Sequence, residues 1–532
     1  MSRKKRWLIG IAAAAMLGSF ALVVAASILA RRFEPYVREQ AIEYLHKRFD
    51  SEVELAQLRV HLPKTSPLRL LLTKGRSTLA RVDGEGISLR HKGRRDVPPM
   101  FGIRKFRFEV DLGTLFDTPK TIPLVLLEGM EITIPPKGER LKLSADSSPE
   151  GDSESQTAVL IKEVIIKDAK LVILPKDSKK LALAFGIQNL RLNWASTGVV
   201  MLYDAALTIP KPPGAIHSVG SFGPWNAAEP GDTPLSGDYT LEKADLGVFA
   251  GIAGILSSTG HFEGTLDTIH AKGRASVPDF RLKRAGNAVP LMTQFEVLVD
   301  GTNGNTLLQP VNAILGMTNF TTSGGVIKHE GDLRRAVGLE VSMPQGNLRD
   351  VLRLAVKGTP FMEGQIFLET KIEIPPLAGK VREKLKLDGR FQVRHGKFLR
   401  STTQDSIDGL SRRGQGQPNS EEIDEVVSGM KGAFKLENEV IRFRSLFFGV
   451  SGAKVDLKGS YDLHRDALDF HGTLKLQAKV SQTMTGWKRW ALKPADPFFA
   501  KEGAGTFFRI QVTGTSRAPK FGLDHGEKGP SS

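Results

Sequence analysis

The chain has 532 residues, a formal net charge of +16 and no cysteine. The absence of thiols excludes disulfide bonds and thiolate metal sites. The length exceeds what one compact core usually contains, and it favours several domains or an elongated repeat.

A long uncharged segment opens the sequence, directly after four basic residues. Residues 7–30 are mostly apolar, and about 20 such residues suffice to cross a bilayer as one helix. A cleavable signal peptide normally has a shorter apolar core of about 7–15 residues. We therefore expect an uncleaved transmembrane anchor, with residues 1–6 in the cytoplasm, because more basic residues precede the segment than follow it. The flanking cations, expected at the membrane surface, are Arg3, Lys4, Lys5, Arg6, Arg31 and Arg32.

Positive charge is concentrated near this segment. Residues 1–110 hold 22 lysines and arginines against 10 acidic residues, whereas the rest of the chain holds 52 against 48. Basic residues beside a membrane are attracted to anionic headgroups by about 1 kcal/mol each. A membrane surface is therefore the predicted partner. Nucleic acid, the other common partner of a basic chain, is not expected, because the predicted topology points the body away from the cytoplasm.

A helical pattern follows the anchor. Glu34 and Pro35 suit a first helical turn, and apolar residues recur at helical spacing from Phe33 to Phe49. Two placements fit such a helix: packing on the body of the protein, which we expect, or lying in the membrane interface.

From Glu52 onward, alternation of apolar and polar residues predicts strands. Period-two alternation indicates a sheet with one wet face and one dry face, as in the segment 105–112 (KFRFEVDL). The dry-face residues are the candidates for binding an apolar ligand. They are Phe106, Phe108, Val110 and Leu112, then Leu181, Leu183 and Phe185, and finally Leu457, Gly459, Tyr461, Leu463, Phe470, Gly472, Leu474 and Leu476.

A few segments depart from this pattern. The acidic, polar stretch 144–156 (SADSSPEGDSESQ) predicts a disordered connection. Short helical patterns occur around residues 245–256, 348–355 and 420–430.

A small glycine repeat occurs inside the predicted strands. Its form is apolar, any, Gly, any, apolar, any, apolar, and its glycines are Gly364, Gly389, Gly432, Gly459 and Gly472. Each glycine falls on the dry face. Glycine either marks a bend where a sheet curves or leaves room for an apolar molecule that is not protein. The recurrence favours one curved sheet of similar units over unrelated domains.

Catalytic motifs are absent from the sequence. It has no phosphate-binding loop, no nucleophile elbow and no pair of histidines at metal-ligand spacing. Carboxylates such as Asp83, Asp300 and Asp388 directly precede glycines, which is typical of turns. We expect neither enzymatic activity nor a cofactor.

Several strand-and-turn segments, taken in order, resemble the bacterial AsmA-like family. The resemblance covers the C-terminal segment 459–524, the segments 260–280, 299–307 and 408–416, and the opening FEPYVREQAIEYLHKRF after the anchor. It is weakest over residues 60–230. It implies a periplasmic body related to TamB and YhdP and to the bridge-like lipid-transfer superfamily, in which a taco-shaped sheet carries acyl chains on an apolar concave face.

The predicted fold is mainly β, with a transmembrane helix followed by an elongated, curved antiparallel sheet, a taco-like groove and a few short helices. Alternation alone would favour closed sandwiches, because large exposed apolar faces are unusual, but lipid could fill an open groove. The predicted segments are a basic tip (1–6), an anchor (7–30), an N-terminal β region with its leading helix (31–143), an acidic linker (144–156), middle groove repeats (157–400), a C-terminal β region (401–524) and a disordered tail (525–532).

The expected function is an inner-membrane-anchored periplasmic carrier or conduit for phospholipid or another acyl lipid. It would move lipid between the inner and outer membranes and so support envelope integrity. The alternative is a non-catalytic assembly or scaffold factor, which would bind outer-membrane or other envelope proteins through exposed strand edges.

Overall fold

A computed structural model describes the chain from residue 51 to residue 524, with gaps, and isolated positions between 35 and 46. The gaps of three residues or more are 62–78, 92–98, 112–119, 135–158, 174–182, 196–198, 225–229, 284–286, 329–331, 421–425, 486–492 and 497–504. The predicted anchor 7–30, the acidic linker 144–156 and the tail 525–532 lie outside the described residues. In the part that is described, no helix is long and apolar enough to span a membrane.

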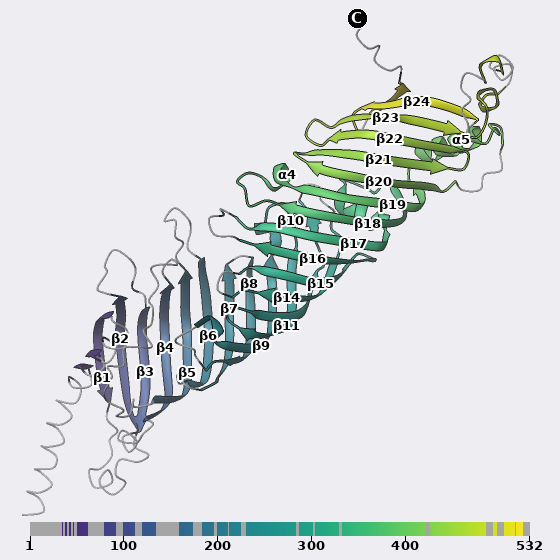
Figure 1. Ribbon diagram of the computed structural model, residues 1–532. Coiled ribbons are helices and arrows are strands. Elements are labelled where there is room, and N and C mark those ends of the chain that lie inside the picture. The colour runs from purple at the N-terminus through teal and green to yellow at the C-terminus, as the bar shows by residue number, and fades with distance from the viewer. Residues whose placement is uncertain are drawn as a thin grey trace, which may run out of the picture. The chain divides into compact units, whose positions relative to one another are not determined.

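The described chain divides into two compact units. Unit 1 consists of Met1–Glu242 with His261–Asp267, and unit 2 of Lys243–Gly260 with Thr268–Ser532. Both are built from strands, as the alternation predicts (Figure 1). The first nine strands are β1 (Ser51–His61), β2 (Leu79–His91), β3 (Phe101–Asp111), β4 (Lys120–Ile134), β5 (Val159–Ile173), β6 (Leu183–Ala195), β7 (Met201–Pro210), β8 (Pro213–Phe222) and β9 (Pro234–Asp245).

The later strands continue in the same manner, with few helical interruptions. Short 3-10 turns occur at Pro230–Asp232, Leu246–Val248, Val480–Thr483 and Lys493–Ala495. The remaining elements are β10 (Ile252–Ala253), β11 (Ile255–Thr265), β12 (Ile269–Val277), β13 (Arg281–Leu282), β14 (Leu291–Val299), β15 (Thr306–Leu315), β16 (Thr318–Ile327), β17 (Ala336–Asn347), α3 (Leu348–Ala355), β18 (Met362–Ile374), α4 (Val381–Lys384), β19 (Lys386–Phe398), α5 (Ser401–Gly414), β20 (Ser428–Glu437), β21 (Val440–Val450), β22 (Ala453–Asp462), β23 (Ala467–Leu476), β24 (Thr506–Gly514) and β25 (Pro519–Leu523).

Strand pairing follows chain order. Twenty-three of the described strands belong to one hydrogen-bonded sheet, while β10 and β13 form a separate ribbon. Antiparallel pairing prevails, as expected, but β4 and β5 run parallel, which corrects the prediction of an antiparallel sheet. A parallel pair needs a long connection that returns the chain to the same end of the sheet. The interval 135–158 is long enough for that, and it contains the segment predicted as a linker.

The core of unit 1 gathers apolar side chains from consecutive strands. Ile103, Met130 and Ile166 are buried together, from β3, β4 and β5. A second cluster centres on Leu55, Leu58 and Val82, and Ile42 packs against it. Ile42 occupies a helical position in the segment predicted as the leading helix. That residue therefore packs on the body, as we expected.

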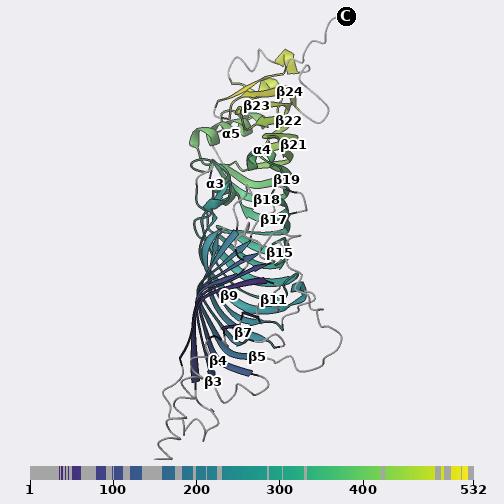
Figure 2. The same ribbon diagram turned by 90° about the vertical axis from the view of Figure 1, so that its left-hand side faces the viewer.

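The core of unit 2 combines one face of its sheet with a helix. Met343, Met362, Ile366 and Val393 from β17, β18 and β19 are buried together with Leu348 of α3. The helix begins where the sequence predicts, because the Asn347 side chain accepts a hydrogen bond from the Arg349 amide at 2.9 Å and caps the first turn. Figure 2 shows α3 and α5 at the same side of the strands of unit 2.

The helical prediction at 245–256 is wrong, because these residues contain only a 3-10 turn followed by strands β10 and β11. The prediction at 420–430 lies in part outside the described residues, at 421–425, and β20 already begins at Ser428 inside this interval. The helix described in this region is α5, at Ser401–Gly414. Its buried Gln404 accepts a hydrogen bond from the Phe398 amide at 2.9 Å and donates one to the Asp408 carboxylate at 2.8 Å. Such polar side-chain contacts are not visible in a pattern of apolar periodicity.

Candidate functional site

The described candidates between residues 106 and 185 lie in β3 and β6 of unit 1. Phe106, Phe108 and Val110 lie in β3 and are partly exposed. The rings of Phe106 and Phe108 stack, with centroids 6.2 Å apart. Leu183 and Phe185 belong to β6. Leu112 and Leu181 lie outside the described residues.

Most of the candidates between residues 457 and 476 come together on two neighbouring strands of unit 2. Leu457 pairs with Gly472, and Gly459 pairs with Phe470, across β22 and β23. Cross-strand partners point to the same face of a sheet, so these candidates share one face. The further members on that face are Tyr461, Leu474 and Leu476. Leu463 is not among them, because it follows the end of β22 and is 42% exposed.

An aromatic row crosses this face of unit 2. It consists of Phe391 in β19, Phe434 in β20, Phe443 in β21 and Phe470 in β23. Successive ring centroids lie 6.3, 6.4 and 5.7 Å apart. These spacings are within the range of favourable aromatic pairs. The register continues the row through Val512 of β24 to Phe521 of the edge strand β25.

Of this aromatic row, only Phe470 is among the dry-face binding candidates predicted from the sequence. The signal for two others was present in the glycine repeat, because Phe391 and Phe434 stand two positions after Gly389 and Gly432. Phe443 belongs to no repeat. Its place in the row follows from its pairing with both Phe434 and Gly459.

The repeat glycines lie beneath aromatic rings or against neighbouring backbone. A Cβ atom on Gly432 would lie 2.9 Å from the Phe391 ring. A Cβ atom on Gly459 would meet the Asp469 carbonyl oxygen and would lie 2.6 Å from the Phe470 Cα. The rings of Phe443 and Phe470 therefore approach each other over a strand position without a side chain. This geometry favours the interpretation that glycine allows close approach in a curved sheet, rather than leaving an empty space.

The apolar face is only partly shielded from solvent. Phe470 and Leu476 are 6% and 5% exposed. Phe391, Phe434, Phe443, Leu457 and Leu474 are half-buried. At the edge strand, Phe521 is 77% exposed. The aromatic row is thus half-buried from Phe391 to Phe443, buried at Phe470 and exposed to solvent at Phe521.

The opposite face of these strands carries ion pairs between neighbouring strands. Lys371 contacts Glu340 at 2.7 Å, and Lys386 contacts Glu437 at 2.9 Å. The hydrogen bond that Lys371 donates to Glu340 raises the pKa of Lys371, and the hydrogen bond that Glu437 accepts from Lys386 lowers the pKa of Glu437. Such exposed pairs contribute little to stability, but they keep this face polar and the sheet two-sided.

Within the described residues, no group of three or more histidines and carboxylates could hold a metal ion. What the site offers chemically is an apolar stripe bounded by polar surface. Comparisons of the chain with protein-family models, with curated proteins and with solved structures return no match. The function must therefore be argued from the site itself.

Proposed function

We propose that this protein carries acyl lipid along the apolar face of its sheet. The observation that supports the proposal most directly is the aromatic row, whose rings from Phe391 to Phe443 are half-buried rather than sealed in a core. Exposed apolar area of this extent normally has a partner. A row of rings one strand apart suits a long, flexible hydrocarbon better than a compact ligand.

Energetics make such a surface suitable for transfer. Burying a methylene group stabilises it by about 0.8 kcal/mol, whether the surroundings are a bilayer or an apolar protein face. Exchange between the two is therefore close to neutral, and a chain can move along the row without a bound nucleotide or a catalytic residue. The polar opposite face, with its ion pairs, keeps the sheet soluble during transfer.

The cellular setting of the proposal comes from the sequence. The apolar segment 7–30 would anchor the chain in the inner membrane, and the body would lie in the periplasm. The protein would then act as a carrier or conduit for phospholipid between inner and outer membranes, in line with the AsmA-like resemblance. Damage to the apolar face should weaken the envelope.

A charged residue on the apolar face tests the carrier proposal. The full chain, purified in a non-ionic amphipol, would be mixed with a photo-crosslinkable fatty acid. We expect Leu474→Asp to retain native circular dichroism, because Leu474 is half-buried and water can reach the carboxylate, but to lose most of the labelling. Thr473→Asp is the matched control, since Thr473 precedes Leu474 on β23 and faces the opposite side. Equal labelling of both variants and the native chain would reject the proposal.

A second candidate function is supported by the exposed edge strand. All five residues of β25 are exposed, and Phe521 and Leu523 are 77% and 49% exposed. Unpaired edges can accept a strand from another protein, as an assembly or scaffold factor for outer-membrane proteins would require. Phe521→Lys should then abolish partner capture by crosslinking, whereas Leu474→Asp should leave that capture intact. Loss of fatty-acid labelling in both variants with partner capture retained in both would favour the carrier.

A further inference from the structure

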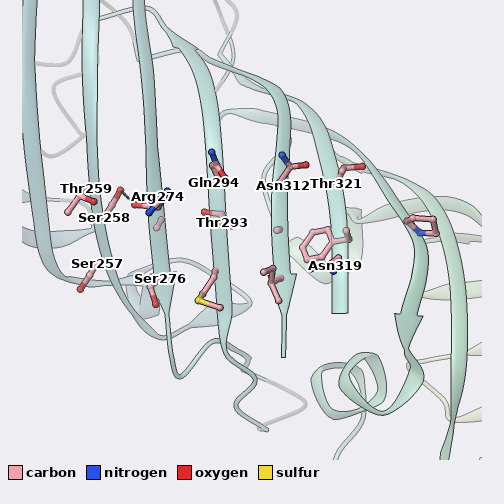
Figure 3. A pocket seen from close by; sticks show the side chains of 16 residues that line it. Ser257, Ser258, Thr259, Arg274, Ser276, Thr293, Gln294, Asn312, Asn319 and Thr321 are labelled. Atoms are coloured by element: carbon pink, nitrogen blue, oxygen red, sulfur yellow. Dashed lines mark hydrogen bonds between the residues drawn. The ribbon is translucent and has the colours of Figure 1, made fainter. Parts of the chain in front are cut away.

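A hollow of about 710 Å³ lies on six neighbouring strands of unit 2, on the face that bears the Lys371–Glu340 pair and away from the aromatic row (Figure 3). The strands are β11, β12, β14, β15, β16 and β17, the last of which contributes Pro344. Two rows of exposed side chains line it. The register places Arg274, Gln294, Asn312 and Thr321 opposite one another across four of these strands. Figure 3 shows them side by side in one row.

The second row is more apolar. Met292 pairs with Ile314 across β14 and β15, one pleat away from Gln294 and Asn312 on the same face. Their side chains are 50% and 37% exposed. The hollow therefore places a line of hydrogen-bonding groups beside a line of hydrocarbon.

The charge in this hollow differs from that of the neighbouring surface. Arg274 is the single charged residue in its lining, which contains no carboxylate. Two residues earlier on the same strand and face, Lys272 is paired with Glu296 at 3.3 Å. No described acidic side chain pairs with Arg274. Its exposed guanidinium group is thus an unneutralised cation among amides and hydroxyls.

These features match one ligand chemistry. A guanidinium group binds phosphate oxygens through paired, charge-assisted hydrogen bonds. The amides of Gln294 and Asn312 and the hydroxyl of Thr321 can each donate to or accept from a polyol. Met292 and Ile314 can contact the first carbons of an attached acyl chain.

We propose that this hollow binds a phosphate ester of glycerol, with Arg274 on the phosphate and the amide row on the polyol. The source of the ester is a phospholipid headgroup or a soluble glycerol phosphate. The lipid source rests on the proposed function, whereas recognition of the phosphate does not.

Calorimetric titration of the full chain in a non-ionic amphipol tests the assignment. The probes are dihexanoyl phosphatidylglycerol, glycerol 3-phosphate and dihexanoylglycerol, which lacks the phosphate. Arg274→Gln should weaken binding of the phospholipid about 10- to 100-fold, the usual effect of losing a hydrogen bond to a charged group. Asn312→Asp, which places a carboxylate beside the phosphate, should weaken it comparably. Lys272→Gln, the matched control, should change the affinity less than twofold.

The three probes separate the two sources. Tighter binding of the phospholipid than of glycerol 3-phosphate assigns a lipid headgroup, and equal binding assigns the soluble ester. The proposal is overturned if dihexanoylglycerol binds as tightly as the phospholipid, or if both Arg274→Gln and Asn312→Asp bind like the native chain. Fatty-acid labelling of Arg274→Gln should remain native. If the native chain took up no fatty acid yet lost phosphate binding in Arg274→Gln, the carrier function would fail while this site would stand.

Discussion

The close packing at Gly459 makes a quantitative prediction about stability. Replacing Gly459 by Ala places a methyl group against the Asp469 carbonyl oxygen and 2.6 Å from the Phe470 Cα, both of them backbone atoms. Backbone cannot rotate aside as a flexible side chain can, so β22 and β23 must separate. Overpacking of this kind typically costs about 1–3 kcal/mol.

The same substitution disturbs an aromatic pair. The rings of Phe443 and Phe470 meet with centroids 5.7 Å apart across the Gly459 position. Such pairs contribute about 0.5–1.5 kcal/mol beyond their buried area. If separation of the strands weakens this contact as well, we expect Gly459→Ala to lower the free energy of unfolding by about 1.5–4.5 kcal/mol.

The assay is urea denaturation followed by circular dichroism, together with hydrogen exchange of the β22 and β23 amides. Gly338→Ala is the matched control, because Gly338 also lies inside a strand, β17, and its Cβ would meet nothing within 4 Å. The control should be neutral or stabilising by up to about 1 kcal/mol. If Gly459→Ala were no more destabilising than Gly338→Ala, the reasoning about the glycine repeat would be refuted.

Three further predictions concern other parts of the chain. The hydrogen bond that His471 makes with Asp524, with a smaller contribution from Asp469, raises the pKa of His471. Because Asp524 directly follows β25, this bond stabilises the strand when His471 is protonated. The stabilisation should therefore be complete below about pH 6.5 and should decline as pH rises through the raised pKa. Hydrogen exchange of β25 that did not accelerate over this range would contradict it. Asp350 is buried and accepts hydrogen bonds from the Met317 amide at 2.8 Å and the Thr318 hydroxyl at 3.0 Å; Asp350→Ala should reduce the free energy of unfolding, measured by urea denaturation, by about 2–3 kcal/mol. A reporter fused after Ser532 should be active only outside the cytoplasm, and activity inside would reject the predicted orientation.

Local patterns in the sequence determined the type of most elements. The alternation in 105–112 predicts a strand, and Phe101–Asp111 forms β3. The helical pattern at 348–355 matches α3, because its cap, Asn347, lies directly before it in the chain. Both predictions depend on the spacing of residues a few positions apart, which a single sequence records directly. The dry-face candidates of β22 and β23 were predictable for the same reason.

Pairing between distant strands was decided only by the tertiary structure. The parallel pairing of β4 with β5 depends on the course of a long connection, which alternation does not encode. Phe443 joins Phe470 over Gly459 through register and a bulge in β21, since a shift of one residue would turn its ring to the other face. The hollow around Arg274 likewise requires six strands in a particular register. Side-chain periodicity defines the two faces of each strand, but the alignment of neighbouring strands determines which side chains meet on them.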